Sequence, residues 1–356
     1  MKTHRFEKSS DRVSLKLPEK YTSSLNVRET EAAIKYIKDY YQNQLVHTLN
    51  LSRVSAPIIV LGRTGINDYL NGWEMPVHFH IRDMDEQGEV VQSLAKWKRM
   101  ALADYGFQPG EGLYTDMNAI RPEETLDNLH SLYVDQWDWE RIILDKERNL
   151  DFLKKIVRSI YQSILETESD ICQRYPSVSA PYLPEEIYFI HSEELLDRYP
   201  NRSPEAREDA ICKEKGAVFI IGIGGVLKNG QSHDGRASDY DDWTTETTSG
   251  RRGLNGDILV WYPLLNQAYE LSSMGVRVDA ASLKVQVEIK GESHKLELDY
   301  HRRLLKGELP LTIGGGIGQS RLCMLFLRKA HIGEVQASIW PDTMRIQCRK
   351  KNIFLL

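Results

Sequence analysis

The chain has 356 residues with 46 Lys and Arg against 51 Asp and Glu, which gives a formal net charge of −5. This balance excludes a polybasic protein that coats nucleic acid, and we expect no nucleic-acid partner. Hydrophobic residues at 41% and charged residues at 27% are typical of an ordinary globular protein rather than a disordered or fibrous one.

The sequence also indicates where the protein works. Its longest nearly apolar run, residues 217–227, is shorter than the roughly 20 residues that a membrane-spanning helix needs. The first twenty residues carry charges throughout and contain no apolar core of a secretory signal. The cysteines lack metal-binding spacing and are typical of free thiols in a reducing compartment: Cys172, Cys212, Cys323 and Cys348. We expect a cytoplasmic protein with no membrane partner.

Hydrophobic periodicity predicts the elements in chain order. A capping box at Asn26 begins a helix that continues to about residue 46, and further helices are predicted at residues 93–105, 150–172, 204–216, 280–288 and 295–306. Strands are predicted at residues 56–61, 131–140, 186–190, 217–223, 256–261 and 269–278. Because the strands occur in clusters and no linker interrupts the chain, we expect one α+β domain with an antiparallel sheet.

The segment from Arg121 to the strand at residues 131–140 is the most informative one. Alternation along this strand places Gln136 and Asp138 on one face, together with Leu132, Val134 and Glu140. The opposite face is aromatic and carries Tyr133, Trp137 and Trp139. A hairpin with a solvated polar face is one interpretation. The other is that Gln136 and Asp138 face a ligand, because polar groups on a partly buried face need partners.

Two further patterns suggest nucleotide chemistry. Asp257 and Glu270 lie on consecutive predicted strands, and paired carboxylates commonly hold Mg²⁺ on a nucleoside triphosphate, although surface charges are the alternative. A glycine run at residues 314–318 then opens a helix that carries Arg321. Glycines let a backbone approach phosphate or a base closely, whereas the simpler interpretation is a tight turn. No GxxxxGK[ST] motif exists, so a P-loop is excluded.

Arg121-x-Glu123, the acidic strand pair and the glycine run with its Arg, in this order, resemble motifs 2 and 3 of class II aminoacyl-tRNA synthetases. The chain as a whole resembles the ammonia-dependent aspartate–ammonia ligases, or asparagine synthetases A, through blocks at residues 93–99, 110–115, 133–141, 239–243, 253–261 and 313–321. Two regions depart from the bacterial pattern. Residues 1–24 look like an N-terminal extension of a single catalytic domain at residues 25–356, and the loop at residues 62–72 has a variant sequence.

The resemblance implies a class II synthetase-like core, an antiparallel sheet flanked by helices, which usually forms a homodimer. It implies a two-step ligation that uses ATP with Mg²⁺. The β-carboxylate of L-aspartate attacks the α-phosphate of ATP and expels pyrophosphate. Ammonia then attacks the β-aspartyl adenylate, giving L-asparagine and AMP.

The resemblance also implies roles for individual residues. The catalytic residues would be Asp68, Arg121 and Gln136. Aspartate would be bound by Lys98, Asp138, Ser272, Ser273 and Arg277. ATP would be bound by Arg121, Glu123, Asp241, Gly316, Gly318 and Arg321, with Mg²⁺ on Asp257 and Glu270.

Alternative functions follow from the same resemblance. A tRNA synthetase or a ligase of other specificity is disfavoured because no segment is long enough for an anticodon-binding domain and the net charge is negative. A non-catalytic paralogue that serves as a binding or regulatory subunit is disfavoured because the charged residues of the motifs are present: Arg121, Asp257, Glu270 and Arg321. A glutamine-dependent synthetase is excluded because Lys2 follows Met1, which leaves no N-terminal Cys nucleophile.

Overall fold

The computed structural model describes residues 15–68, 70, 74–178, 180–248 and 250–356, so the first 14 residues of the expected extension lie outside the described part. An eight-stranded sheet has the order β1-β5-β6-β13-β12-β11-β8-β7. It is antiparallel except for the parallel outer pairs β1/β5 and β7/β8, so the predicted α+β class is confirmed. The strands are Leu51–Arg53 (β1), Gly112–Ile120 (β5), Tyr133–Ile142 (β6), Tyr188–His191 (β7), Ala217–Ile221 (β8), Asn255–Tyr262 (β11), Gln267–Val276 (β12) and Thr312–Gly318 (β13).

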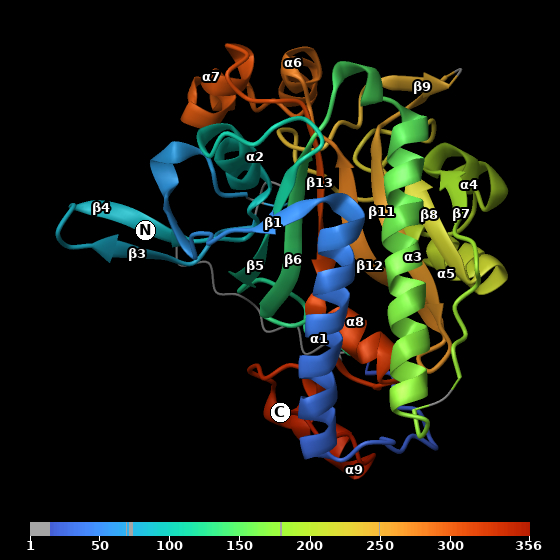
Figure 1. Cartoon of the computed structure of the whole chain (residues 1–356). Coiled ribbons are helices and arrows are strands. Elements are labelled where there is room, and N and C mark those ends of the chain that lie inside the picture. The colour runs from blue at the N-terminus through green and yellow to red at the C-terminus, as the bar shows by residue number, and fades with distance from the viewer. Residues whose placement is uncertain (1–14, 69, 71–73, 179, 249) are drawn as a thin grey trace, which may run out of the picture.

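One face of the sheet is covered by α1 (Val27–Leu49) and α3 (Leu150–Arg174), which cross it in Figure 1, and by α8 (Gln319–Phe326) near its lower end. The aromatic face of β6 points into this layer, where Trp137 and Trp139 are fully buried. Tyr41 of α1 packs on Trp137 with ring centroids 4.9 Å apart. The predicted division of this strand into an aromatic and a polar face is therefore confirmed, and the aromatic face is the core.

The opposite face carries helices at its ends. In Figure 1, α2 (Ala95–Asp104), α6 (Ala280–Ile289) and α7 (Asp299–Leu305) gather at the upper end, where they share an apolar cluster. Helices α4 (Ser192–Arg198) and α5 (Pro204–Lys215) cover β7, β8 and β11 at the other side. The remaining elements are small: β2 (Ile59–Leu61), β3 (His78–Ile81), β4 (Glu86–Val90), β9 (Glu246–Thr248), β10 (Arg251–Arg252) and α9 (Asp342–Lys350).

Local sequence signals set several helix ends. The Asn26 side chain accepts a hydrogen bond from the Glu29 main-chain nitrogen at 3.0 Å, and the Glu29 carboxylate accepts from the Asn26 main-chain nitrogen at 2.9 Å. The predicted capping box is therefore confirmed. Ser203 caps α5, which has Pro204 at its first position, and Gly216 ends this helix with a φ of +78°.

The glycine run differs from its prediction. Residues 312–318 form β13 in the middle of the sheet, between β6 and β12, and the helix begins only at Gln319. The close packing of neighbouring strands explains the glycines, since a Cβ at Gly315 would lie 2.5 Å from the Met274 Cβ. The helix predicted at residues 295–306 is interrupted by Leu298, which has an extended backbone with ψ of 157°.

The described part of the extension lies against the body of the protein. The Lys16 main chain and the Asn128 side chain exchange two hydrogen bonds, at 2.8 and 2.9 Å, and the Tyr21 hydroxyl donates to Glu334 at 2.8 Å. That residues 25–356 form one domain stays a prediction. Within the described ranges, no helix combines the length and apolar character needed to cross a membrane.

Gly315 and Gly316 point to opposite faces of β13, so an added methyl group should affect stability differently at the two positions. A Cβ at Gly315 would lie 2.7 Å from the main-chain oxygen of Ser273, whereas a Cβ at Gly316 would overlap the end of the flexible Gln136 side chain. We expect Gly315→Ala to lower the free energy of unfolding by about 1–3 kcal/mol and Gly316→Ala by clearly less. Denaturant unfolding of both variants measures this, and equal losses would contradict it.

Candidate active site

Two adjoining cavities, of about 420 and 190 Å³, lie over the polar face of the central strands. They share a wall built from the loop after β5 and from strands β6, β12 and β13, with the residues Arg121, Glu124, Gln136, Glu270 and Gly316. The larger cavity extends towards α2 and the loop that precedes β9. The smaller one extends to the N-terminal end of α8. The shared wall means that ligands in the two cavities would touch each other.

The structure gathers most of the predicted site residues around these cavities. The larger one is lined by Asp68, Arg121, Glu123, Gln136, Asp138, Asp241, Glu270, Ser273, Arg277 and Gly316. Gly318 and Arg321 line the smaller one. Strand register explains part of this set, because Gly316 lies directly opposite both Asp138 and Ser273 on its two neighbouring strands. Directly opposed residues point to the same face of a sheet.

Lys98 is not among the lining residues, because it is fully buried beneath Asp138. Its ammonium forms an ion pair with the Asp138 carboxylate and donates to the main-chain oxygen of Trp139 at 2.9 Å. Burial raises the pKa of Asp138, although Lys98 acts in the opposite direction. The structure therefore places Lys98 next to Asp138 but outside the residues that line the larger cavity, and its role in binding aspartate stays a prediction.

Ser272 lies on the other face of β12. It is paired with Ile258 and Ile317, which belong to the hydrophobic core, and its side chain is 1% exposed. The neighbouring Ser273 points to the cavity side because successive residues of a strand alternate. The structure therefore brings Ser273, but not Ser272, to the cavity.

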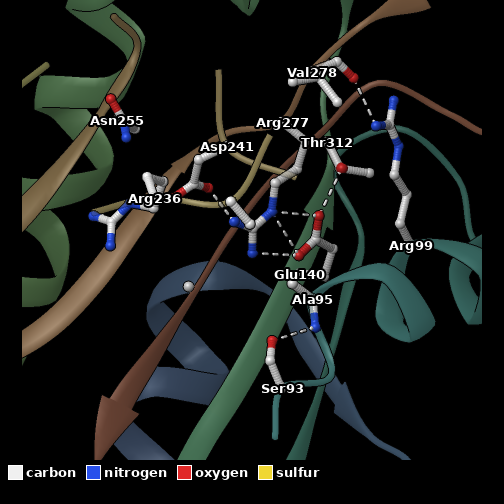
Figure 2. A network of polar contacts seen from close by, with 12 residues as sticks. Ser93, Ala95, Arg99, Glu140, Arg236, Asp241, Asn255, Arg277, Val278 and Thr312 are labelled. Atoms are coloured by element: carbon white, nitrogen blue, oxygen red, sulfur yellow. Dashed lines mark hydrogen bonds and ion pairs between the residues drawn. The ribbon is translucent and has the colours of Figure 1, made fainter. Parts of the chain in front are cut away.

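Arg277 is held by two carboxylates, as Figure 2 shows. Its Nε and Nη2 atoms donate to Glu140 at 3.0 and 2.9 Å, and its Nη1 atom donates to Asp241. Thr312 donates to the same Glu140 carboxylate at 2.7 Å. Burial opposes the charge of Arg277, but Glu140 and Asp241 raise its pKa well above the ordinary range.

This arrangement leaves Arg277 with a defined binding capacity. A guanidinium has five N–H groups, and the contacts with Glu140 and Asp241 use three of them. The other two lie one on each terminal nitrogen, at a residue that lines the larger cavity. Guanidinium N–H groups without a protein partner at a cavity wall can bind a carboxylate.

A second arginine, Arg236, lies beside the acidic strand pair. Its Nη2 atom is 2.6 Å from Asp257 and its Nε atom is 3.3 Å from Asp241. Burial raises the pKa of Asp257 to about 7, with Arg236 acting against this shift and Glu270 adding to it. Asp257 is not among the residues that line the cavities, but it lies directly opposite Ser273 on the neighbouring strand, and its charge interacts with that of Glu270.

Arg321 defines the smaller cavity. Its Nη1 atom donates to the main-chain oxygen of Glu270 at 2.9 Å, and its guanidinium lies 5.5 Å from the centre of the Tyr269 ring. Gly318 precedes the first turn of α8, where a Cβ would lie 2.8 Å from the Arg321 side chain. A planar cation that is fixed on a cavity wall suits a flat base or a phosphate.

The described residues contain no cluster of three or more His, Cys, Asp or Glu side chains arranged to hold a metal ion. Asp257 and Glu270 nevertheless supply hard oxygen donors, and their negative charges repel each other. A divalent cation at this position would need further oxygen ligands, which the phosphates of a bound nucleotide supply.

Sequence reasoning missed three residues of the site. Arg236 could have been suspected from the nearby acidic run at residues 239–242, since buried carboxylates need a cation. Glu140 was placed on the correct face but received no role. Gln92, which lines the larger cavity, gives no signal in the sequence.

The fold and the site define a class II synthetase catalytic core, and solved structures support this. Asparaginyl-tRNA synthetase from Entamoeba histolytica, in complex with asparaginyl-adenylate, matches with a TM-score of 0.61 and 15% identity over 87% of this chain and 66% of its own. The enzyme from Pyrococcus horikoshii, also complexed with asparaginyl-adenylate, matches with a TM-score of 0.60 and 17% identity over 88% of this chain and 70% of its own. At these identities the likeness shows the fold.

Sequence comparisons define the family. The family model described as aspartate-ammonia ligase matches residues 28–352. An aspartate–ammonia ligase from Parabacteroides distasonis is 57% identical over 340 residues, which cover 95% of this chain and 98% of the relative. Another from Bacillus mycoides is 55% identical and covers 94% and 99%. The chain belongs to the aspartate–ammonia ligase family, so the predicted enzyme class is confirmed.

The Glu140 network predicts a large loss of stability when its charge is removed. Glu140→Gln would leave the buried Arg277 short of one counter-charge, and breaking a buried pair costs about 3–5 kcal/mol. The matched control is Asp39→Asn, which breaks the exposed pair with Lys35 and should change stability by less than about 1 kcal/mol. Denaturant unfolding compares the two variants, and equal effects would disprove the structural importance of the network.

Proposed function

We propose that the protein joins ammonia to the β-carboxylate of L-aspartate in two steps, through a β-aspartyl adenylate, with release of pyrophosphate and AMP. The observation that carries this proposal is the shared wall of the two cavities, with Arg121 at their junction. A carboxylate in one cavity and a triphosphate in the other would meet there. The family membership supports the same chemistry, and a non-catalytic role would leave the arrangement without a purpose.

Aspartate would bind in the larger cavity. The two remaining N–H groups of Arg277 receive its α-carboxylate, and Asp138, oriented by Lys98, receives its α-ammonium. Ser273 orients the substrate from β12, and Ser272 contributes only by packing on the far side of this strand. The β-carboxylate is thereby directed towards Arg121 and Gln136.

ATP would bind along the shared wall and in the smaller cavity. Arg121 stabilises the negative charge that develops at the α-phosphate during attack. Stabilisation of developing charge by fixed groups is usually the largest single contribution to catalysis. Glu123 lies beside Arg121, the backbone at Gly316 and Gly318 allows close approach, and Arg321 holds the adenine or the γ-phosphate. Asp241 acts on both substrates through the arginines that it binds, Arg236 and Arg277.

Mg²⁺ fits the acidic strand pair, where Asp257 and Glu270 would hold it together with phosphate oxygens. When bound, the ion neutralises charge on the triphosphate and on the departing pyrophosphate. Arg236, whose Nη2 atom lies 2.6 Å from Asp257, supplies part of this neutralisation from the protein.

In the second step, Gln136 positions the adenylate and Asp68 takes a proton from the attacking nitrogen. Both residues line the larger cavity. We further propose that the enzyme acts in the cytoplasm as a homodimer, with residues 25–356 as one catalytic domain.

A direct test mixes the protein with aspartate, ATP, Mg²⁺ and ammonium. We expect asparagine and AMP in equal amounts, measured by chromatography. Formation of ADP in place of AMP would contradict the adenylate route, and absence of both products would contradict the function.

Removing either of the proposed ATP-binding arginines should lower turnover strongly while leaving the fold intact. Arg121→Ala and Arg321→Ala should each lower kcat about 10²–10³-fold, because one fixed donor to developing charge is lost. Arg63→Ala is the control, since this arginine is exposed and pairs with Glu86 away from the cavities. Initial rates and circular dichroism measure the outcome, and unfolding with unchanged turnover per folded molecule would assign the arginines a purely structural role.

The proposed metal ligands predict a change in magnesium dependence. Asp257→Asn and Glu270→Gln should each raise the Mg²⁺ concentration that supports half-maximal rate by about tenfold or more, because each removes an anionic oxygen ligand. Rates over a magnesium titration measure this. Unchanged dependence in both variants would remove these residues from the metal site.

A further inference from the structure

Gln92 carries an unexplained amide in the larger cavity. The residue lies between β4 and α2, lines the cavity and is 0% exposed. Neither its Oε1 nor its Nε2 atom has a hydrogen-bond partner within the described part of the chain. A buried amide without partners destabilises a fold, so a side chain of this kind is best explained by a ligand.

Asn67 holds Gln92 close to Asp68, whose carboxylate also has an oxygen without a partner in the described chain. The Asn67 side-chain oxygen accepts from the main-chain nitrogen of Asp68 at 3.0 Å and from that of Gln92 at 2.9 Å. The amide nitrogen of Asn67 donates to the main-chain oxygen of Val90 at 3.2 Å, which anchors the arrangement to β4. The side-chain oxygen of Asn67 thus holds the main chains of Asp68 and Gln92 close to each other.

Asp68 is 3% exposed, and these contacts do not satisfy the hydrogen-bonding capacity of its carboxylate. Its Oδ1 atom accepts from the main-chain nitrogen of Leu70 at 3.1 Å, while Oδ2 has no partner among the described residues. Burial raises the pKa of Asp68 to about 6, with Lys96 and Arg121 acting against this shift and Asp239 adding to it. The carboxylate is therefore anionic near neutral pH, yet able to accept a proton.

The two groups together match one kind of ligand. The Asp68 Oδ2 and Gln92 Oε1 atoms are both acceptors, one of them charged, so they suit a small cation that carries several N–H donors. The α-ammonium of aspartate already has a carboxylate in Asp138, which lines the same cavity. Ammonium itself has the charge and the donors for the remaining pair.

We propose that Gln92 and Asp68, held together by Asn67, form the binding subsite for ammonium. This inference rests on the proposed function and adds the place where the nucleophile binds. Ammonium passes one proton to the Asp68 carboxylate, and the freed nitrogen lone pair forms a bond to the β-carbonyl carbon of the adenylate. The bond from this carbon to the phosphate oxygen breaks, AMP leaves with the electron pair, and the second proton passes to solvent.

The test compares Gln92→Leu, which keeps the volume and removes both polar atoms, with Arg63→Ala, an exposed change outside both cavities. Two assays separate the steps: aspartate-dependent exchange of labelled pyrophosphate into ATP, and asparagine synthesis over an ammonium titration. We expect Gln92→Leu to raise the KM for ammonium at least about tenfold while pyrophosphate exchange continues, and Arg63→Ala to match the wild type in both assays. Asn67→Ala should follow Gln92→Leu.

Thermal unfolding adds a second readout. Because leucine removes an unpartnered buried amide, Gln92→Leu should be at least as stable as the wild type, so a loss of ammonium affinity could not be explained by misfolding. A wild-type KM for ammonium in Gln92→Leu, or equal losses of exchange and synthesis, would overturn the subsite. If the wild type neither exchanged pyrophosphate nor formed asparagine, the proposed function itself would fail, which is a different result.

Discussion

The ion pair between Arg277 and Glu140 is the interaction on which the site depends. Both side chains are almost completely buried in the middle of the sheet, where charges are stable only with close counter-charges. Lys98 lies 3.7 Å from Glu140 and Asp241 binds Arg277, so the pair extends into a network. Gly314 lies directly opposite Glu140, and a Cβ there would overlap the carboxylate. A glycine strand is therefore a condition for burying these charges.

The same network requires a fixed strand register. On β6, Trp137 and Trp139 face the helices α1 and α3, while Asp138 and Glu140 face the cavity side. A shift of the β6 register by one residue would turn the tryptophans towards the cavity and the carboxylates into the core. The hydrophobic layer therefore does more than stabilise the fold, because burying the aromatic face determines which charges reach Arg277.

Signals confined to one element could be predicted from sequence. The capping box at Asn26 and the two faces of β6 follow from neighbouring residues, and both are confirmed. The structure gathers many motif residues, but it places Lys98 under Asp138 and Ser272 in the core, since these positions depend on what packs behind a strand. The glycine run was predicted to open a helix, or to form a tight turn, because local propensity disfavours glycine in strands; packing across three strands overrides this preference.

Buried polar groups in this site fall into two kinds, and the difference separates architecture from chemistry. Arg277 uses three of its five N–H groups on protein partners, so its position is set before any ligand arrives. The Gln92 amide and one Asp68 oxygen have no such partners in the described chain, although Asn67 fixes their backbones. Buried polar groups with protein partners preorganise the cavity. Buried polar groups without partners carry a desolvation cost, which a bound ligand relieves. The unsatisfied atoms consequently point to where a reactant, rather than the fold, completes the hydrogen bonding.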